Sequence, residues 1–500
     1  MKALLAPSFL VGLLAGCAIG PDYRLPAALG TNRMPAAFAG AAALTNMGNW
    51  KPAEPSAHLP RGVWWEIFGD SELNRLETAA SEANQDLAVA FSRFEQARAL
   101  VNVARADLFP QASATPSLTR QRTSVNMVDR GQASGVSHTY NTFTVPLDAS
   151  WELDLWGRVR RQVEAARALL SAAADDLEAA KLAVQAEVAT DYFVLRAMDA
   201  EYALLQQTAE AYRRSLELTR NRRQGGIASD LDVAQAETQL TTTEAQLPAV
   251  DLQRAKLRHA LGTLCGQVAG GFEPAPAQGA LASGPAIPIS LPSELLERRP
   301  DIAAAERRMA AANAEVGVAQ TAFYPRVQFQ GVAGFQSIDA STLFDWPSRF
   351  WAVGPSLGLP LFTGGRNRAQ LAAARAAYNS AVGSYRKTVL VAFQEIEDQL
   401  AAQRLLAAEL DAENAALASA RRTLEIANNR YKAGLVTYLE VATAQSAALA
   451  HERTVVELGA QRLSASVGLI KALGGGWSAK EGGRSVAQAP RYPEREATAR

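Results

Sequence analysis

The chain has 500 residues, enough for two or three domains, and 48% of them are hydrophobic, as in a folded protein. Its 50 Lys and Arg residues balance 50 Asp and Glu residues, so the formal net charge is zero. This balance argues against nucleic-acid binding through a generic basic surface.

The N-terminus has the pattern of a secretory signal. Lys2 precedes an apolar run from Ala3 to Leu14, which is too short to span a bilayer as a mature helix. The run ends in Leu14-Ala15-Gly16-Cys17, which resembles the bacterial lipobox. We therefore expect residues 1–16 to be a signal peptide and residues 17–70 an acylated N-terminal segment. The alternative is an ordinary signal peptide followed by an incidental cysteine.

The two cysteines have different expected roles. Cys17 is the expected lipid-attachment residue, and Ala18 follows it in place of the aspartate that retains many such lipoproteins at the inner membrane. The resemblance therefore implies the outer membrane. Cys265 then has no disulfide partner, and one exported thiol is typical of neither a disulfide framework nor a metal site. We expect Cys265 to be buried.

The first repeat is expected at residues 71–264. It begins with one helix whose apolar residues alternate at intervals of three and four, as in a coiled-coil seam. Two strands with alternating apolar and polar residues follow, at about 111–122 and 140–155. A long helix over residues 158–224, roughly 100 Å in length, ends at Gly225-Gly226. A return helix over 229–264 follows, in which Pro248 predicts an interruption. The seam residues of the first helix are Leu73, Leu76, Ala80, Ala83, Leu87, Ala90, Phe94, Ala97, Val101, Ala104 and Leu108.

The second repeat is expected at residues 295–473, after a Pro-, Gly- and Ala-rich linker at 265–294. We expect the linker to pack around the middle of the long helices. The second repeat has the same order of elements: a helix, strands at about 326–338 and 350–361, a long helix over 366–433, and a return helix over 437–473. Residues 474–500 form a C-terminal tail without a predicted structure.

Matched residues identify the two sets of elements as copies. Gly226 matches Gly434 and Leu231 matches Leu439, both at an offset of 208 residues. Upstream of the strands the offset is 215, so the first copy has seven extra residues between Pro110 and Gly157. Both long helices end at a glycine turn, as expected where a helix reverses through a left-handed C-cap.

The strands have the length and pattern of membrane strands. A tilted membrane strand needs about 9–11 residues, and one face of each predicted strand is apolar. The alternative is a soluble sheet with one face on a core. Four strands cannot close a barrel, and an open edge is not tolerated in lipid, so several chains must share one barrel. The fold class expected is mainly α with a membrane β-barrel, and the long helices suit a structure that crosses the periplasm.

The chain resembles the TolC-like outer-membrane factor family, in its lipoprotein branch of the OprM and NodT type. The resemblance covers nearly the whole mature chain. It depends on the duplication and on the order of several short motifs: Cys17-Ala18-Ile19-Gly20-Pro21-Asp22-Tyr23, Trp64-Trp65, Arg298-Arg299-Pro300-Asp301-Ile302, the two glycine turns, and Lys471-Ala472-Leu473-Gly474-Gly475-Gly476-Trp477.

The resemblance implies a homotrimer in which each chain contributes four strands to one twelve-stranded barrel, continued by an α-helical tunnel. It implies passive conduction of drugs or other small amphipathic molecules from an inner-membrane pump, of the resistance-nodulation-division type, through a periplasmic adaptor (a membrane fusion protein). Outer-membrane lipid is a further expected partner, and nucleic acid is not. No motif indicates an enzyme, a cofactor or a metal site.

Two other functions share some of these features. A periplasmic adaptor also has a lipid anchor and a coiled coil, but it would have one helical hairpin and no paired membrane strands. A duct for type I protein secretion has the same fold, and the lipid anchor favours efflux by family analogy alone.

The resemblance also implies the location of a periplasmic gate and of the adaptor contact. The gate positions are at the start of the return helix, where Thr443 and Ser446 replace the aspartate and arginine usual in the lipoprotein branch. We therefore expect packing, not an ion pair, to hold the tip closed. The expected gate residues are Leu439, Glu440, Thr443 and Leu231, and the expected adaptor-contacting turns contain Gly225, Gly226, Ile227, Ala433, Gly434 and Leu435.

Overall fold

The computed structural model describes residues 18–29, 62–124, 137–275 and 298–475. The expected signal peptide and Cys17, most of the linker and nearly all of the tail lie outside the described residues. The chain forms two compact units, which we call the sheet unit and the hairpin unit. Each takes residues from both repeats, so the duplication and the compact units divide the chain differently. The sheet unit consists of residues 1–27, 93–173 and 304–385, and the hairpin unit of residues 28–92, 174–303 and 386–500.

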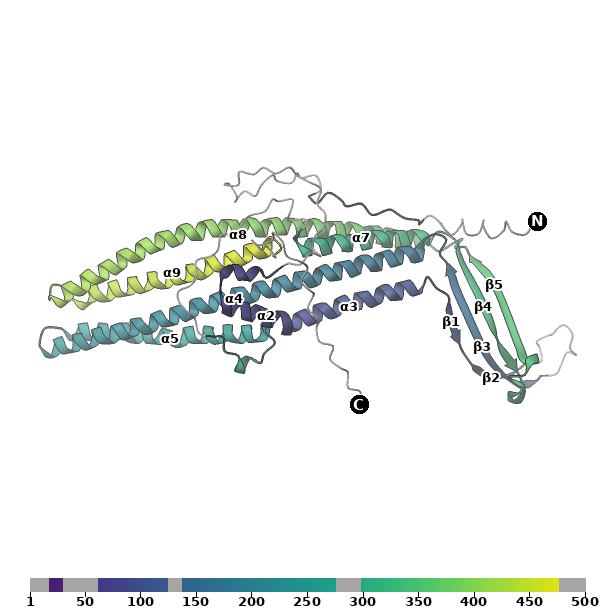
Figure 1. The fold of residues 1–500 in the computed structure, drawn as a ribbon, viewed down its shortest axis with the longest axis horizontal. Helices are drawn as coiled ribbons and strands as arrows, with labels where there is room; N and C mark the ends of the chain where they lie inside the picture. Colours follow the sequence, from purple (N-terminus) through teal and green to yellow (C-terminus); the bar gives the residue numbers. More distant parts are fainter. Residues whose placement is uncertain (1–17, 30–61, 125–136, 276–297, 476–500) are drawn as a thin grey trace. The chain divides into compact units, whose positions relative to one another are not determined.

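The sheet unit contains one antiparallel sheet in which five strands occupy four positions (Figure 1). The order is β1-β3-β4-β5, and β2 pairs with β3 beyond the end of β1. The two predicted hairpins are therefore neighbours, joined through β3 and β4. The strands are β1 (Gln111–Ala114), β2 (Ser117–Arg122), β3 (Thr139–Leu153), β4 (Arg326–Ser337) and β5 (Arg349–Gly358).

Two strand predictions need correction. The stretch expected as one strand at 111–122 is interrupted at Thr115-Pro116, because proline has no N–H to donate to the ladder. The strand expected to reach residue 361 ends at Gly358, two residues before Pro360, for the same reason. The strand expected at 140–155 begins and ends slightly earlier, as β3.

The strand register collects the apolar side chains on one face of the sheet. Trp151 lies opposite Phe329, Ala333 lies opposite Trp351, and Val327 lies opposite Leu357. Directly paired residues share a face, so the apolar residues of the four strand positions form one continuous surface. The other face carries Thr142, Thr144, Asp148, Ser150, Glu152, Gln328, Gln330 and Gln336.

The long helices have the length that the sequence predicts. Helix α4 (Arg158–Gln224) and helix α8 (Arg366–Lys432) have 67 residues each. Residues 158–173 and 366–385 belong to the sheet unit, together with most of α3 (Gln85–Ala106) and α7 (Pro300–Thr321). Small side chains let these helices approach closely, since Ala165, Ala311 and Ala314 form a buried cluster.

The hairpin unit contains the two return helices, α5 (Asp230–Leu264) and α9 (Tyr438–Ala472), each of 35 residues. Figure 1 shows α5 beside the lower part of α4 and α9 beside α8. Pro248 lies inside α5, but the helix continues through it as one element. The expected interruption is therefore absent from α5.

The first helix of the first repeat is not continuous. Helix α2 (Ser71–Ala83) ends at Asn84, whose backbone is extended, and α3 begins one residue later. The Asn84 side chain explains the break, because its oxygen accepts the N–H groups of Asp86 at 2.9 Å and Leu87 at 3.1 Å. Its amide nitrogen donates to the carbonyl of Leu264 at 2.9 Å. The apolar seam continues across residue 84 although the helix does not, so the periodicity alone predicts one helix.

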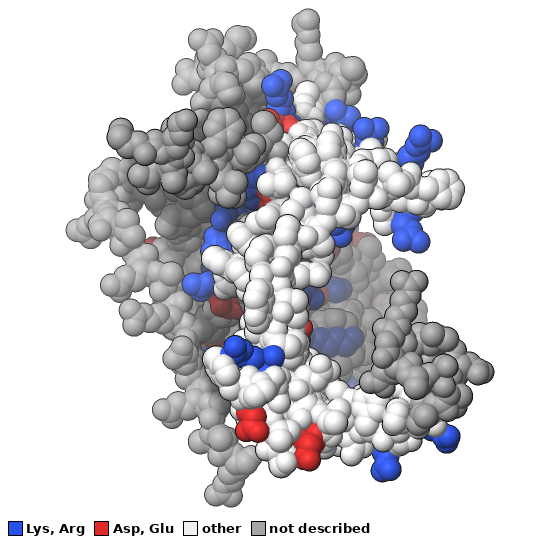
Figure 2. Space-filling model, turned by 90° about the vertical axis from the view of Figure 1, so that its right-hand side faces the viewer, with Lys and Arg blue, Asp and Glu red and all other residues white. Residues whose placement is uncertain are grey.

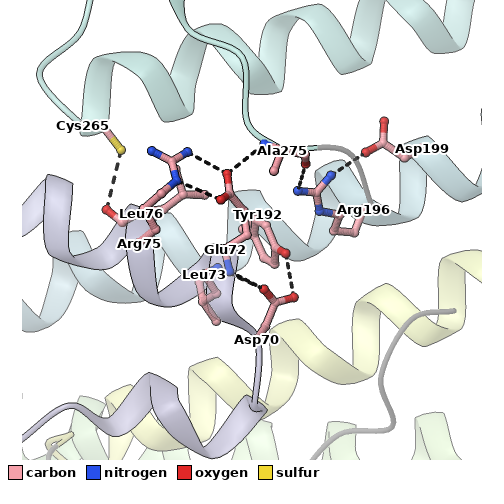
Figure 3. A network of polar contacts seen from close by, with 10 residues as sticks. All are labelled: Asp70, Glu72, Leu73, Arg75, Leu76, Tyr192, Arg196, Asp199, Cys265 and Ala275. Carbon is pink, nitrogen blue, oxygen red and sulfur yellow. Dashed lines mark hydrogen bonds and ion pairs between the residues drawn. The ribbon is translucent and has the colours of Figure 1, made fainter. Parts of the chain in front are cut away.

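A polar network joins α2 to α4 and to the segment that follows α5 (Figure 3). Asp70 caps α2 and accepts the Tyr192 hydroxyl at 2.6 Å, and Glu72 accepts the Ala275 N–H at 2.9 Å. Arg196 donates to the Ala275 carbonyl at 2.6 Å. The start of the linker is thus held against the middle of α4, as expected.

The core beside this network contains two buried groups of the hairpin unit that titrate away from their usual range. Cys265 is buried, as expected, and its thiol lies 3.7 Å from the Leu76 carbonyl. Glu77 is fully buried, and neither carboxyl oxygen has a hydrogen-bond partner among the described residues. Burial raises the pKa of Glu77 to about 9, so this side chain is neutral at pH 7.

In the part of the chain that the structure describes, none of the helices is apolar enough over sufficient length to span a membrane.

Candidate functional site

The candidate functional site is the pair of tip turns of the hairpin unit, residues 225–228 and 433–436. Gly226 has a φ of 75° and Gly434 a φ of 76°. In each turn the residue after the glycine donates its N–H to a carbonyl five residues earlier, at 2.8 Å in the first turn and 3.0 Å in the second. These are Schellman closures of the long helices. The left-handed backbone explains why both copies have glycine at this position.

The two return helices begin differently. Ser229 and Asp232 form a capping box at the start of α5: the Ser229 hydroxyl accepts the Asp232 N–H at 3.1 Å, and the Asp232 carboxylate accepts the Ser229 N–H at 2.9 Å. Thr437 makes no side-chain cap for α9. The other Asp232 oxygen accepts the Tyr438 N–H at 3.0 Å. One carboxylate of the first repeat therefore caps both return helices.

The bonds to Asp232 also change its acidity. Partial burial raises the pKa of Asp232, but the hydrogen bonds from Ser229 and from the Tyr438 N–H outweigh burial, and the pKa lies below its usual value. Asp232 is therefore ionised at neutral pH, and its charge lies at the positive ends of two helix dipoles.

The core under the tip is shared by both repeats, and the second repeat contributes a close aromatic pair. Tyr438 is fully buried, and its ring packs against Tyr431 at 5.5 Å between centroids in an edge-to-face arrangement. The Tyr438 hydroxyl lies 3.2 Å from Gln445 Oε1, to which it donates. Burial raises the pKa of Tyr438, so the hydroxyl stays protonated. At the equivalent positions of the first repeat, Arg223 and Asp230 form an exposed ion pair.

Several contacts tie the two hairpins together near the tip. Arg222 donates to the Lys432 carbonyl at 2.9 Å, and its guanidinium carbon lies 4.9 Å from the centre of the Tyr431 ring. The Tyr431 hydroxyl lies 3.3 Å from the Thr219 hydroxyl. Gln239 donates to the Ser446 hydroxyl at 2.9 Å, and the Tyr438 N–H bond to Asp232 also joins the two hairpins. The tip is thus a joined structure and not two separate hairpins.

The expected gate residues lie on exposed sides of the two return helices, with Leu439, Glu440 and Thr443 in α9 and Leu231 in α5. Leu439, Thr443 and Ser446 recur at helical spacing, and all three are exposed. Leu439 is 56% exposed in this single chain, whereas its neighbours Tyr438 and Val441 are fully buried. Leu231, the equivalent of Leu439 in the first repeat, is 66% exposed. The helix therefore separates a packing side from a side that is open to a further partner.

The charged candidate Glu440 has a partner that the sequence did not predict. Its carboxylate lies 3.8 Å from an Arg430 nitrogen of α8, and both side chains are about half exposed. Thr443 donates its hydroxyl to the Leu439 carbonyl at 2.8 Å. Thr443 and Ser446 carry no charge, so closure by packing stays a prediction.

The turns themselves expose apolar side chains. Ile227 is 69% exposed and Leu435 is 70% exposed, and they follow Gly226 and Gly434 directly. Gly225 and Ala433 follow the last residues of α4 and α8, and each donates its N–H to the carbonyl four residues earlier. The two turns therefore present matching apolar tips.

The residues next to the expected acylation site lie where the sheet joins its helices. Cys17 is outside the described residues, but the N–H of Ile19 donates to the Trp156 carbonyl at 3.0 Å, between β3 and α4. A Cβ added to Gly157 would lie 2.8 Å from the Ala18 Cα. Asn313 of α7 donates to the Pro21 carbonyl at 2.9 Å. The start of the described chain is therefore fixed at the helix-proximal edge of the sheet.

Sequence reasoning missed the shared cap and the aromatic pair. The Ser229-x-x-Asp232 pattern is a recognisable capping signal. The second role of Asp232 has no sequence signal, because its bond to Tyr438 joins residues 206 positions apart. Tyr431 and Tyr438 are seven residues apart in the sequence and on opposite sides of the turn, where no helical period relates them.

Comparison with known families agrees with this architecture. The family model described as "Outer membrane efflux protein" matches residues 77–267 and 291–475. The solvent efflux pump outer membrane protein SrpC of Pseudomonas putida is 32% identical over 481 residues, which cover 96% of this chain and 100% of that protein. Outer membrane protein OprJ of Pseudomonas aeruginosa is 35% identical over 483 residues, with 96% of each chain covered.

Solved structures give the same result. The outer-membrane channel OprN has a TM-score of 0.81 and 32% identity, and the match covers 92% of this chain and 99% of that one. The CmeC outer membrane channel of Campylobacter jejuni has a TM-score of 0.82 and 27% identity, with 93% and 96% covered.

Proposed function

Because the chain belongs to the outer membrane efflux protein family, we propose that it is the outer-membrane channel subunit of a tripartite efflux system. In this role it conducts small amphipathic molecules passively and catalyses no reaction. The observation that carries the proposal is the strand register, which separates one continuous apolar face from a polar face. Such a sheet suits lipid on one side and a water-filled lumen on the other.

The assembly we propose is a homotrimer. Four strand positions cannot close on themselves, and within one chain β1 and β2 at one edge and β5 at the other have no further strand beside them among the described residues. Unpaired backbone groups are not tolerated in lipid. Three chains that pair these edges would form one closed sheet of twelve strand positions, with Phe143, Trp151, Trp351 and Leu357 facing lipid.

Partners and cargo follow from the relatives. SrpC is named as part of a solvent efflux pump and others as parts of toluene or antibiotic pumps. We propose a periplasmic adaptor at the exposed tip turns and an inner-membrane pump of the resistance-nodulation-division type. A type I secretion duct is the less favoured alternative, because SrpC and the toluene and antibiotic pump relatives are named as efflux components.

We propose that Cys17 carries the lipid anchor. Ala18 and Ile19 lie at the helix-proximal edge of the sheet, so acyl chains on Cys17 would enter the membrane at that edge. The helix-proximal edge would then lie in the periplasmic leaflet. Mass spectrometry of the mature N-terminus tests this: an unmodified Cys17, or a protein that begins elsewhere, contradicts the anchor.

The experiment that tests the channel is reconstitution. The detergent-extracted protein should be a trimer by light scattering and should conduct ions in planar bilayers. A stable monomer would contradict the shared barrel, and a trimer that inserts in lipid without conducting would contradict the channel.

A further inference from the structure

The two ends of the strands differ in their connections. At one end, which we call the helix rim, the strands connect to α3, α4, α7 and α8. At the other end, which we call the loop rim, the segments 123–138 and 338–348 connect the strands of each hairpin. If the helix rim lies in the periplasmic leaflet, as proposed above, the loop rim lies at the external surface.

Three arginines lie at the loop rim on the apolar face. Arg120 and Arg122 follow Leu118 at intervals of two, and Leu118 lies opposite Phe143 on that face. Arg349 lies opposite Phe335 and two residues before Trp351, also on that face. All three side chains are exposed. They are the only charged residues that the described strands place on the apolar face, and all are positive.

The surface around these arginines is suited to a membrane interface. The Arg349 guanidinium lies 3.6 Å from the centre of the Trp346 ring, which is 73% exposed. Aromatic side chains of this kind occur at the level of lipid headgroups. Figure 2 shows a broad band of uncharged residues on this end of the protein, with Lys and Arg along its sides and charged residues of both signs at its ends.

The three guanidinium groups are open to an additional ligand. Arg122 donates one N–H to the Ser137 hydroxyl at 3.1 Å, and no ion pair joins Arg120, Arg122 or Arg349 to an acid among the described residues. The nearby Asp339 of the 338–348 segment accepts from the N–H and the hydroxyl of Ser341. Asp339 and Asp345 of the same segment form no ion pair with the three arginines among the described residues, so the guanidinium groups are available to an anionic ligand.

We propose that Arg120, Arg122 and Arg349 bind the phosphate groups of anionic lipids in the outer leaflet. Guanidinium groups bind phosphate through paired N–H bonds. The apolar face below the arginines would contact the acyl chains of the same lipids. This inference rests on the proposed membrane position of the sheet.

The proposed trimer would concentrate this charge. Within one chain, β2 and β5 lie at opposite edges of the sheet, roughly 14 Å apart at the usual strand spacing. In a closed barrel the two edges meet, so Arg349 of one chain would come beside Arg120 and Arg122 of the next. Three like charges at each subunit seam would repel one another without an anion, and a lipid phosphate would bridge the seam.

The test is lipid binding by native mass spectrometry of the full-length trimer with bis-phosphorylated lipid A. Arg120→Gln/Arg122→Gln/Arg349→Gln should weaken binding on the order of 10- to 100-fold, since each basic residue near an anionic surface contributes to attraction. The matched control is Arg167→Gln/Arg368→Gln/Arg375→Gln, which removes three exposed arginines from α4 and α8 in the same unit. The control should bind like the wild type.

Three results would overturn the proposal: equal binding by the rim variant and the wild type, equal loss in the control variant, or displacement of lipid A by an equimolar amount of inorganic phosphate. Dephosphorylated lipid A should bind the wild type as weakly as lipid A binds the rim variant. If the triple variant does not assemble, Arg120→Gln alone should still weaken binding by a factor of a few. A wild-type protein that fails to float with lipid vesicles contradicts the membrane position itself, which is a separate failure.

Discussion

At equivalent positions of the two tip hairpins, the first repeat has an exposed ion pair and the second has two packed aromatic rings. Arg223 and Asp230 correspond to Tyr431 and Tyr438 at the repeat offset. The two turns between them have the same left-handed glycine and the same closing hydrogen bonds. The backbone turn is therefore duplicated, whereas the side chains around it make different contacts in the two repeats.

This difference makes the second hairpin depend on the first. Asp232 caps both return helices, but its equivalent Glu440 caps neither and lies beside Arg430. The second repeat supplies the packed pair Tyr431 and Tyr438, and the first supplies the shared cap. Mutations at matched positions of the two repeats should consequently have unequal effects.

The largest inequality is expected between Tyr438→Ala and Asp230→Ala. Removing a fully buried aromatic side chain costs about 3–5 kcal/mol, so amides at the start of α9 should exchange with deuterium at least 100-fold faster in the trimer. Asp230 is exposed, and its loss should change exchange little. Equal exchange in the two variants would mean that the aromatic pair of the second repeat stabilises the tip no more than the ion pair of the first repeat.

The next inequality is expected between Asp232→Ala and Glu440→Ala. Loss of a capping side chain costs about 1 kcal/mol for each helix that it caps, so Asp232→Ala should speed exchange at the first turns of both α5 and α9. Glu440→Ala should change neither by more than a few-fold. If Asp232→Ala speeds exchange in α5 alone, the bond to the Tyr438 N–H contributes nothing to the stability of α9.

Acidity should remove the same cap. The pKa of Asp232 in the folded protein lies below its usual value of 3.8, so its stabilisation is present above that value and is lost as pH falls through the folded pKa. The exchange difference between wild type and Asp232→Ala should therefore disappear at low pH. A difference that persists below the pH at which the Asp232 carboxylate is protonated would mean that the side chain acts without its charge.

Much of the fold follows from the sequence, because it depends on local patterns. Proline-free, alanine-rich stretches and a glycine at each reversal fix α4 and α8 nearly to the residue, and alternation with period two fixes the strand positions. The break at Asn84 could not be predicted, because the apolar seam runs through it and its cause is a bond to Leu264, far away in the sequence.

The site was only partly predictable for the same reason. The sequence locates Leu439 and Glu440 by their position after the turn. The roles of Asp232 and Arg430 depend on which helices are neighbours, and no spacing within one helix encodes that. The three rim arginines likewise acquire a common face only through the strand register.

The smaller functional effects concern the exposed side of the tip. In the proposed trimer, three Leu439 side chains would narrow the tunnel, and Leu439→Ala should raise single-channel conductance roughly twofold or more by widening an apolar constriction. Leu231→Ala, at the equivalent exposed position of the first repeat, should have a weaker effect. Conductance equal to that of the wild type in Leu439→Ala would exclude the hydrophobic gate.

The smallest effect is expected for Glu440→Gln. Three Glu440 carboxylates around a threefold axis would attract cations, since rings of acidic side chains select positive ions. Loss of this charge should lower the cation preference in planar bilayers, measured as a shift in reversal potential under a salt gradient, with little change in conductance.

The exposed Arg430–Glu440 pair at 3.8 Å should contribute at most about 1 kcal/mol to closure. Arg430→Gln is the matched control, because it breaks the same pair and leaves the acidic ring, so it should keep or raise the cation preference. If both Glu440→Gln and Arg430→Gln open the channel, this ion pair is the lock. The tip would then be held by charge between α8 and α9, and not by the packing of Leu439.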